Sequence, residues 1–144
     1  MKVRIQSFGF KRNGYPKSKS GSGDGFVFDC RCIDAFDYPI IKPGRLISRK
    51  LPLWNLTGLD SQIVDVLDKD TDAQNFFRAV WFLVEFNILK GLQRDRKTLV
   101  VNFGCAAGQH RSVYMAEKLT QKIKQVFPDV EIEIVHLEKF LWPT

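Results

Sequence analysis

The sequence has no hydrophobic run long enough to cross a membrane. Its longest apolar run covers residues 79–84 and ends at Glu85, whereas a spanning helix needs about 20 apolar residues. No long apolar stretch follows the charged residues of Met1-Lys2-Val3-Arg4, so the N-terminus does not have the pattern of a secretory signal. We therefore expect a protein of the cytoplasm that has no membrane partner.

Cysteine is scarce, with three residues, Cys30, Cys32 and Cys105. An odd number of cysteines without a secretory signal is typical of free thiols in a reducing compartment. Cys30 and Cys32 have no nearby histidine, which makes them a poor zinc site. The sequence also has no G-x-x-x-x-G-K-[ST] motif, so we expect no Walker ATP site. We expect neither a metal nor another cofactor.

Acidic residues are missing from the first 23 positions, which carry six bases and hold the entire net charge of +6. A localised basic arm is what a phosphate-bearing partner such as RNA selects. A solvated loop that keeps the protein soluble is the alternative interpretation. The candidate RNA-binding residues are those of the arm together with a second basic patch: Lys11, Arg12, Lys17, Lys19, Arg45, Arg49 and Lys50.

A chain of 144 residues, 44% hydrophobic and 26% charged, predicts one globular domain over residues 1–144. Hydrophobic periodicity predicts strands over residues 2–10, 26–33, 98–103 and 130–135, and helices over 60–67, 70–91 and 112–127. The second helix is apolar nearly all round, so we expect it to be well buried. Residues 13–25 read as a flexible basic loop rich in glycine and serine, and residues 34–57 as irregular. This order predicts an α/β domain with a mainly parallel sheet and helices packed on its faces.

The turn between the third predicted strand and the third helix carries the strongest chemical signal. Ligands of open α/β sheets bind at the carboxyl ends of strands, and small residues let backbone amides approach a ligand closely. The following helix N-terminus and an arginine both favour an anion. We expect an anion site formed by Gly104, Cys105, Ala106, Ala107, Gly108, Gln109, His110, Arg111 and Ser112.

An enzymatic alternative uses the same turn. The spacing Cys105-x5-Arg111 matches the signature of cysteine-dependent phosphatases, in which a thiolate attacks a phosphate held by loop amides and an arginine. That family normally has a histidine before the cysteine, where this sequence has Gly104. Cys105 and Arg111 are the catalytic candidates under this alternative.

Five segments in order resemble the C-terminal domain of the RapZ family of RNase adapter proteins. They are residues 104–117, Gln6-Ser7-Phe8-Gly9-Phe10-Lys11, Phe28-Asp29-Cys30-Arg31, Leu56-Thr57-Gly58-Leu59-Asp60 and Leu137-Glu138-Lys139. The resemblance implies a domain that senses an amino-sugar phosphate at the 104–112 turn and has RNA or an RNase as a partner. It also implies assembly into a homo-oligomer. Ala106 and Ala107 replace the family's usual Thr-Gly, so the ligand remains either an amino-sugar phosphate or a nucleotide.

Four further residues are candidates for lining the same pocket. Asp29 and Arg31, two apart on a predicted strand, would share one face, and Cys30 and Cys32 would share the other. Thr57 and Gly58 belong to a turn before a helix, and the resemblance includes them.

His136 has no visible partner and reads as a packed side chain. Our main interpretation is a binding module rather than an enzyme.

Overall fold

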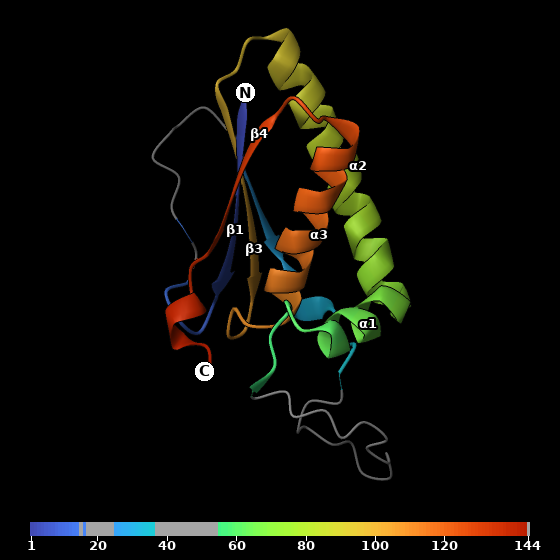
Figure 1. Cartoon of the computed structure of the whole chain (residues 1–144), viewed down its shortest axis with the longest axis vertical. Coiled ribbons are helices and arrows are strands. Elements are labelled where there is room, and N and C mark those ends of the chain that lie inside the picture. The colour runs from blue at the N-terminus through green and yellow to red at the C-terminus, as the bar shows by residue number, and fades with distance from the viewer. Residues whose placement is uncertain (15, 17–24, 37–54, 144) are drawn as a thin grey trace.

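The computed structural model describes residues 1–14, 16, 25–36 and 55–143, and Figure 1 shows its elements. The elements follow one another along the chain as β1 (Lys2–Gly9), β2 (Gly25–Asp29), η1 (Cys30–Cys32), α1 (Ser61–Lys69), α2 (Thr71–Gln93), β3 (Thr98–Cys105), α3 (Arg111–Val126), β4 (Glu131–His136) and η3 (Lys139–Leu141). Of the described residues, no helix is long and apolar enough to span a membrane.

The four strands form one parallel sheet in the order β2-β3-β1-β4. Ile5 in β1 lies opposite Val101 in β3 and Ile134 in β4, which sets the register. Alternate residues of β1 and β3 are fully buried on one face, where α1, α2 and α3 pack against them (Figure 1). The predicted α/β class and parallel sheet are confirmed, with the three helices on the same face.

The opposite face of the sheet carries polar side chains. Gln6 accepts a hydrogen bond from Arg4 Nε and donates one to Asn102 Oδ1. Asn102 in turn donates to the carbonyl of Phe26 on the edge strand. These bonds connect three neighbouring strands. They also give hydrogen-bond partners to the side-chain amides of Gln6 and Asn102, which are buried.

The predicted strand over 26–33 is wrong after Asp29, because the chain turns there into the short helix η1. The Asp29 carboxylate accepts the backbone N–H of Arg31, which closes this turn locally. Asp29 and Arg31 therefore do not share a strand face. Cys30 is buried whereas Cys32 is exposed, so these two cysteines do not share a face either.

The expectation that α2 is buried nearly all round is also wrong. One stripe, spaced at helical intervals, faces the core and contains Ala73, Phe77, Val80, Val84 and Ile88. Phe82, Phe86 and Leu89 point away from it and are 77%, 56% and 46% exposed. The sheet covers one side of the helix only, so apolar residues elsewhere on α2 remain in solvent.

Candidate functional site

The loop that joins β3 to α3, residues 106–110, lies at the carboxyl edge of the sheet. β3 is an inner strand, and its last residue, Cys105, lies opposite Gly9 at the end of β1. On its other side, Gly104 lies opposite Asp29 at the end of β2. The loop thus lies at the edge where the carboxyl ends of these three strands meet, where ligands of parallel sheets bind.

Close backbone packing fixes the shape of this loop. Gly108 has a φ of 69°, and a Cβ there would lie 2.7 Å from the Gly9 nitrogen. A Cβ on Gly9 would likewise lie 2.6 Å from the Ala107 carbonyl carbon, and one on Gly58 would lie 2.4 Å from the His110 carbonyl oxygen. Glycine is required at these approaches, because any side chain would push the loop away from its neighbours.

The side chains of Gln109 and His110 attach the loop to the segment before α1. Gln109 Nε2 donates to the carbonyl of Leu56, and His110 Nε2 lies 2.8 Å from the same oxygen. The Gly58 N–H donates back to the carbonyl of Gln109. The Thr57-Gly58 turn, predicted as a pocket element, therefore lies directly beside the loop.

Arg111 connects the loop to η1. Its Nη1 donates to the carbonyls of Arg31 and Ile33, at 2.9 Å each, and the residue is 8% exposed. The guanidinium carries a positive charge and only donor groups. Arg111 thus places a positive charge beside the loop and also holds η1 in place.

The Cys105 thiol lies at the start of the loop, 3.1 Å from Ser112 Oγ in the first turn of α3. Burial raises the pKa of this thiol. Hydrogen bonds from the Ser112 hydroxyl and from the amides of Ser112 and Gln109, with the charge of Arg111, outweigh burial and hold the pKa below its usual value. Cys30 differs, because burial dominates and raises its pKa well above the ordinary range.

Replacing Ser112 with alanine is expected to raise the pKa of Cys105, because the hydroxyl stabilises the thiolate. The thiolate absorbance near 240 nm, followed against pH in a Cys30→Ala/Cys32→Ala background, measures this change. Since the native pKa is depressed, the thiolate adds stability above the unfolded pKa, and this is lost as pH falls through the native pKa. Ser112→Ala should shrink that pH dependence, and an unchanged titration would contradict the assignment.

Asp29, Arg31 and Phe10 form a cluster beside the loop, in which the two charged residues are exposed and Phe10 is half-buried. The Asp29 carboxylate accepts bonds from Arg31 Nε and Nη2, and the Arg31 guanidinium carbon lies 3.9 Å from the Phe10 ring centroid. The hydrogen bond from Arg31 lowers the pKa of Asp29. Sequence reasoning did not single out Phe10, which the resemblance placed only in an opening strand.

Two of the seven RNA-binding candidates fall within the described residues. Lys11 and Arg12 are exposed in the turn after β1, and the Lys11 N–H donates to the Ala106 carbonyl. This bond places the turn next to the loop. The remaining five candidates lie outside the described residues: Lys17, Lys19, Arg45, Arg49 and Lys50.

The side chain of Glu138 supports the β3–α3 loop, and sequence reasoning did not assign it a role. It is fully buried and accepts bonds from the Gly9 N–H and from both the N–H and the side-chain amide of Asn13. Its Cγ lies against Gly108. Trp142 Nε1 also donates to the Gly108 carbonyl. The C-terminal segment thus contacts the loop at two points.

His136 is a packed side chain, as the sequence indicates, with 7% of the side chain exposed, and the structure gives it two partners that sequence reasoning did not identify. Its Nδ1 lies 2.6 Å from Ser7 Oγ, and its Nε2 lies 2.8 Å from Glu117 Oε1. The three residues come from β4, β1 and α3. Ser7 is fully buried and the Glu117 side chain is 33% exposed, so this chain of contacts connects α3 to the sheet from the core out to the surface.

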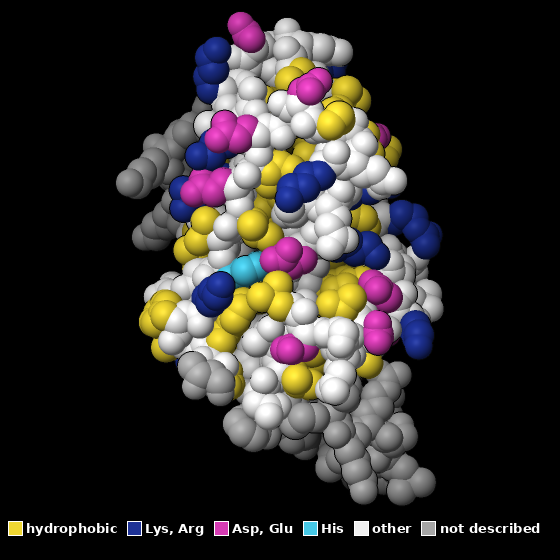
Figure 2. Space-filling view, in the orientation of Figure 1, with side chains coloured by type: hydrophobic (Ala, Val, Ile, Leu, Met, Phe, Trp, Pro, Cys, Tyr) yellow, Lys and Arg dark blue, Asp and Glu magenta, His cyan; other side chains and the backbone are white. Residues whose placement is uncertain are grey.

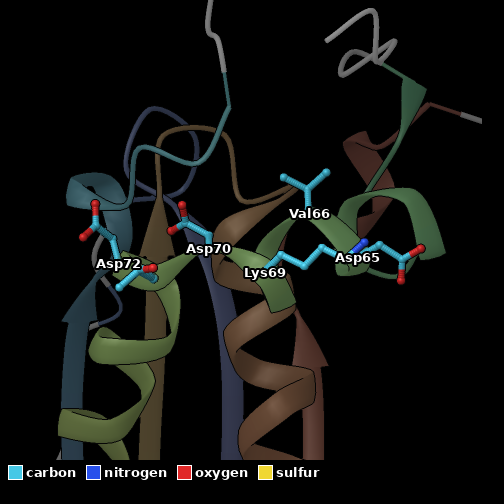
Figure 3. A pocket seen from close by; sticks show the side chains of 6 residues that line it. Asp65, Val66, Lys69, Asp70 and Asp72 are labelled. Atoms are coloured by element: carbon cyan, nitrogen blue, oxygen red, sulfur yellow. The ribbon is translucent and has the colours of Figure 1, made fainter. Parts of the chain in front are cut away.

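A cavity of about 450 Å³ opens at the junction of α1 and α2, and none of the residues that line it belongs to the β3–α3 loop (Figure 3). It is lined by Asp65, Val66, Lys69, Asp70, Thr71 and Asp72. Three carboxylates against one ammonium disfavour an anionic ligand. Figure 2 shows basic and acidic side chains interspersed on the visible face, with no broad patch of one sign among the described residues.

Comparison with known proteins identifies one family. A family model described as RapZ C-terminal domain matches residues 1–139. A protein of Cellvibrio japonicus named "Nucleotide-binding protein" is 30% identical over 132 residues, covering 92% of this chain and 39% of the relative. A protein of the same name from Actinobacillus pleuropneumoniae serotype 5b is 29% identical over 144 residues, covering 96% and 43%. The chain spans about two fifths of the length of these relatives.

Proposed function

Because the chain belongs to the RapZ C-terminal domain family, we propose that it is a ligand-binding module that holds a phosphorylated small molecule at the β3–α3 loop. The observation that carries this proposal is the position of the loop. Its backbone amides fall between the last residue of β3 and the first residue of α3, outside both hydrogen-bonded ladders, and the amide of Gln109 donates to the Cys105 thiol. Amides in this position at a helix N-terminus bind phosphate groups.

The surroundings of the loop support an anion as its ligand. Arg111 supplies a buried positive charge. The pKa of the Cys105 thiol is lowered against burial by hydrogen bonds from Ser112 and from the Gln109 amide, with a smaller contribution from the charge of Arg111. The side chains of Gln109 and His110 fasten the loop to Leu56, which reduces the entropy lost on binding. An amino-sugar phosphate, which the family resemblance implies, and a nucleotide, which the names of the relatives mention, both carry the required phosphate.

Phosphate binding is tested by calorimetric titration with inorganic phosphate, glucosamine 6-phosphate and ribose 5-phosphate. Arg111→Gln should weaken the binding of all three by about tenfold, because one charge-assisted interaction is lost. Arg78→Gln, at an exposed position of α2, is the matched control and should bind like the wild type. Binding that does not differ between these two variants would count against Arg111, and no binding to the wild type would refute the proposal.

A second candidate function is a cysteine-dependent phosphatase. The contact between Cys105 and Ser112 favours it, because a thiolate is the nucleophile of that reaction. Against it, the thiol that would have to attack the phosphate is only 2% exposed. If the protein is a binding module, it should not hydrolyse p-nitrophenyl phosphate, and Cys105→Ser should bind phosphate like the wild type. Turnover that Cys105→Ser abolishes would establish the enzyme.

RNA is the proposed macromolecular partner. We also propose an RNase as a partner and the assembly of this chain into a homo-oligomer. Lys11 and Arg12 support RNA binding, because they are exposed beside the loop. A phosphorylated ligand in the loop would then lie close to an RNA backbone on this turn, which suggests that ligand and RNA influence each other.

A further inference from the structure

The guanidinium of Arg31 lies over the ring of Phe10 at the edge of the sheet, a contact that we call the Arg31–Phe10 stack. The guanidinium carbon of Arg31 lies 3.9 Å from the centre of the Phe10 ring, a distance typical of stacking. Asp29 fixes the guanidinium with bonds of 2.9 Å to Nε and 2.7 Å to Nη2. The orientation of the guanidinium is therefore held before any ligand arrives.

The stack is attached directly to the β3–α3 loop. The Phe10 N–H donates to the Cys105 carbonyl at 2.9 Å, and Arg111 donates to the Arg31 carbonyl. The Phe10 ring also lies over Gly104, where a Cβ would come within 2.5 Å of the ring. Glycine at the end of β3 thus makes room for the stack beside the phosphate site.

The chemistry of Arg31 favours a planar partner over a phosphate. Asp29 occupies the Nε and Nη2 donors, which form the fork with which arginine usually grips a phosphate. One face of the guanidinium covers Phe10, and yet the side chain is 52% exposed. Guanidinium planes stack on nucleobases, which present a flat π surface that a sugar phosphate lacks.

We propose that the ligand of the β3–α3 loop is a nucleotide whose base stacks on Arg31 while its phosphate binds the loop. This inference rests on the proposed function, since the loop must hold the phosphate. Asp29 acts as a positioning residue, because its carboxylate orients the guanidinium without contacting the base.

Calorimetric titrations with AMP, ribose 5-phosphate and inorganic phosphate test the proposal, since the first two differ only by the base and the anomeric group it replaces. AMP should bind about tenfold more tightly than ribose 5-phosphate, in keeping with one stacked base. Arg31→Lys keeps the positive charge and removes the planar face. It should abolish the advantage of AMP over ribose 5-phosphate. Arg78→Lys, at an exposed position of α2, is the matched control for replacing an exposed arginine with lysine.

The outcomes separate this proposal from the proposed function. Equal binding of AMP and ribose 5-phosphate to the wild type would overturn the stacking and leave the phosphate site standing. An advantage of AMP that persists in Arg31→Lys would overturn the role of Arg31. If none of the three compounds binds, the phosphate site fails and the stacking proposal fails with it.

Discussion

Replacing Gly108 with alanine is expected to lower the free energy of unfolding by about 3 kcal/mol. A left-handed backbone costs an alanine roughly 1–2 kcal/mol, and overpacking adds about 1–3 kcal/mol. Both apply here, because φ is 69° and the new Cβ would lie 2.7 Å from the Gly9 nitrogen and 2.8 Å from the Phe8 carbonyl carbon. These are backbone atoms, so they cannot move aside as a flexible side chain does.

Urea denaturation measures this loss, and the melting temperature should fall by about 10 °C for a protein of this size. Gly14→Ala is the matched control, because Gly14 has a φ of 74° and its nearest such contact is Phe10 O at 4.0 Å. Only the backbone cost applies there, and we expect a loss of about 1 kcal/mol. Equal losses in the two variants would show that close packing around Gly108 is unimportant.

Replacing Glu138 with alanine is expected to destabilise the protein by about 3 kcal/mol. The carboxylate is fully buried and accepts three bonds from Gly9 and Asn13. Its removal leaves the buried Gly9 N–H without an acceptor and opens a cavity against Gly108. Phosphate binding should weaken as well, because the β3–α3 loop loses the side chain on which Gly108 rests.

Glu131→Ala is the matched control for Glu138→Ala, since Glu131 is exposed on β4. Its replacement should change the unfolding free energy by less than about 0.5 kcal/mol. Equal stability of the two variants in urea denaturation would contradict the buried role of Glu138. A destabilised Glu138→Ala that still binds phosphate normally would show that the segment supports the fold but not the loop.

Most of the fold could be predicted, because its core residues recur with regular spacing. Val3 and Ile5 alternate with polar residues on β1, and the apolar strand 98–103 precedes a turn and an amphipathic helix. The end of β2 could not be predicted, since Cys30 to Ile33 continues the apolar pattern of a strand. The turn depends on a hydrogen bond from the Arg31 amide to the Asp29 carboxylate, and hydrophobic periodicity does not report such a bond.

The position of the candidate site could be predicted, but the hydrogen-bond partners of its side chains could not. The run from Gly104 to Ser112 indicated an anion loop because small and donor residues follow a strand. The partners of Gln109 and Arg111 are carbonyls 53 and 78–80 residues away, which no local pattern encodes. Glu138 was missed for the same reason, because its burial depends on a contact with Gly9 across 129 residues.

The parallel order of the strands has a consequence for how the molecule is assembled. β1 pairs with β3 and β4, which come much later in the chain. Gln6 bonds to Asn102, 96 residues away, and Ser7 contacts His136, 129 residues away. Closing such long loops before any pairing is gained makes folding slow. During synthesis β1 has no strand partner until β3, 96 residues later in the register, has emerged. The β3–α3 loop, held by contacts from Gly9, Gly58 and Glu138, is thus among the last parts to form, and a chain able to bind has already finished folding.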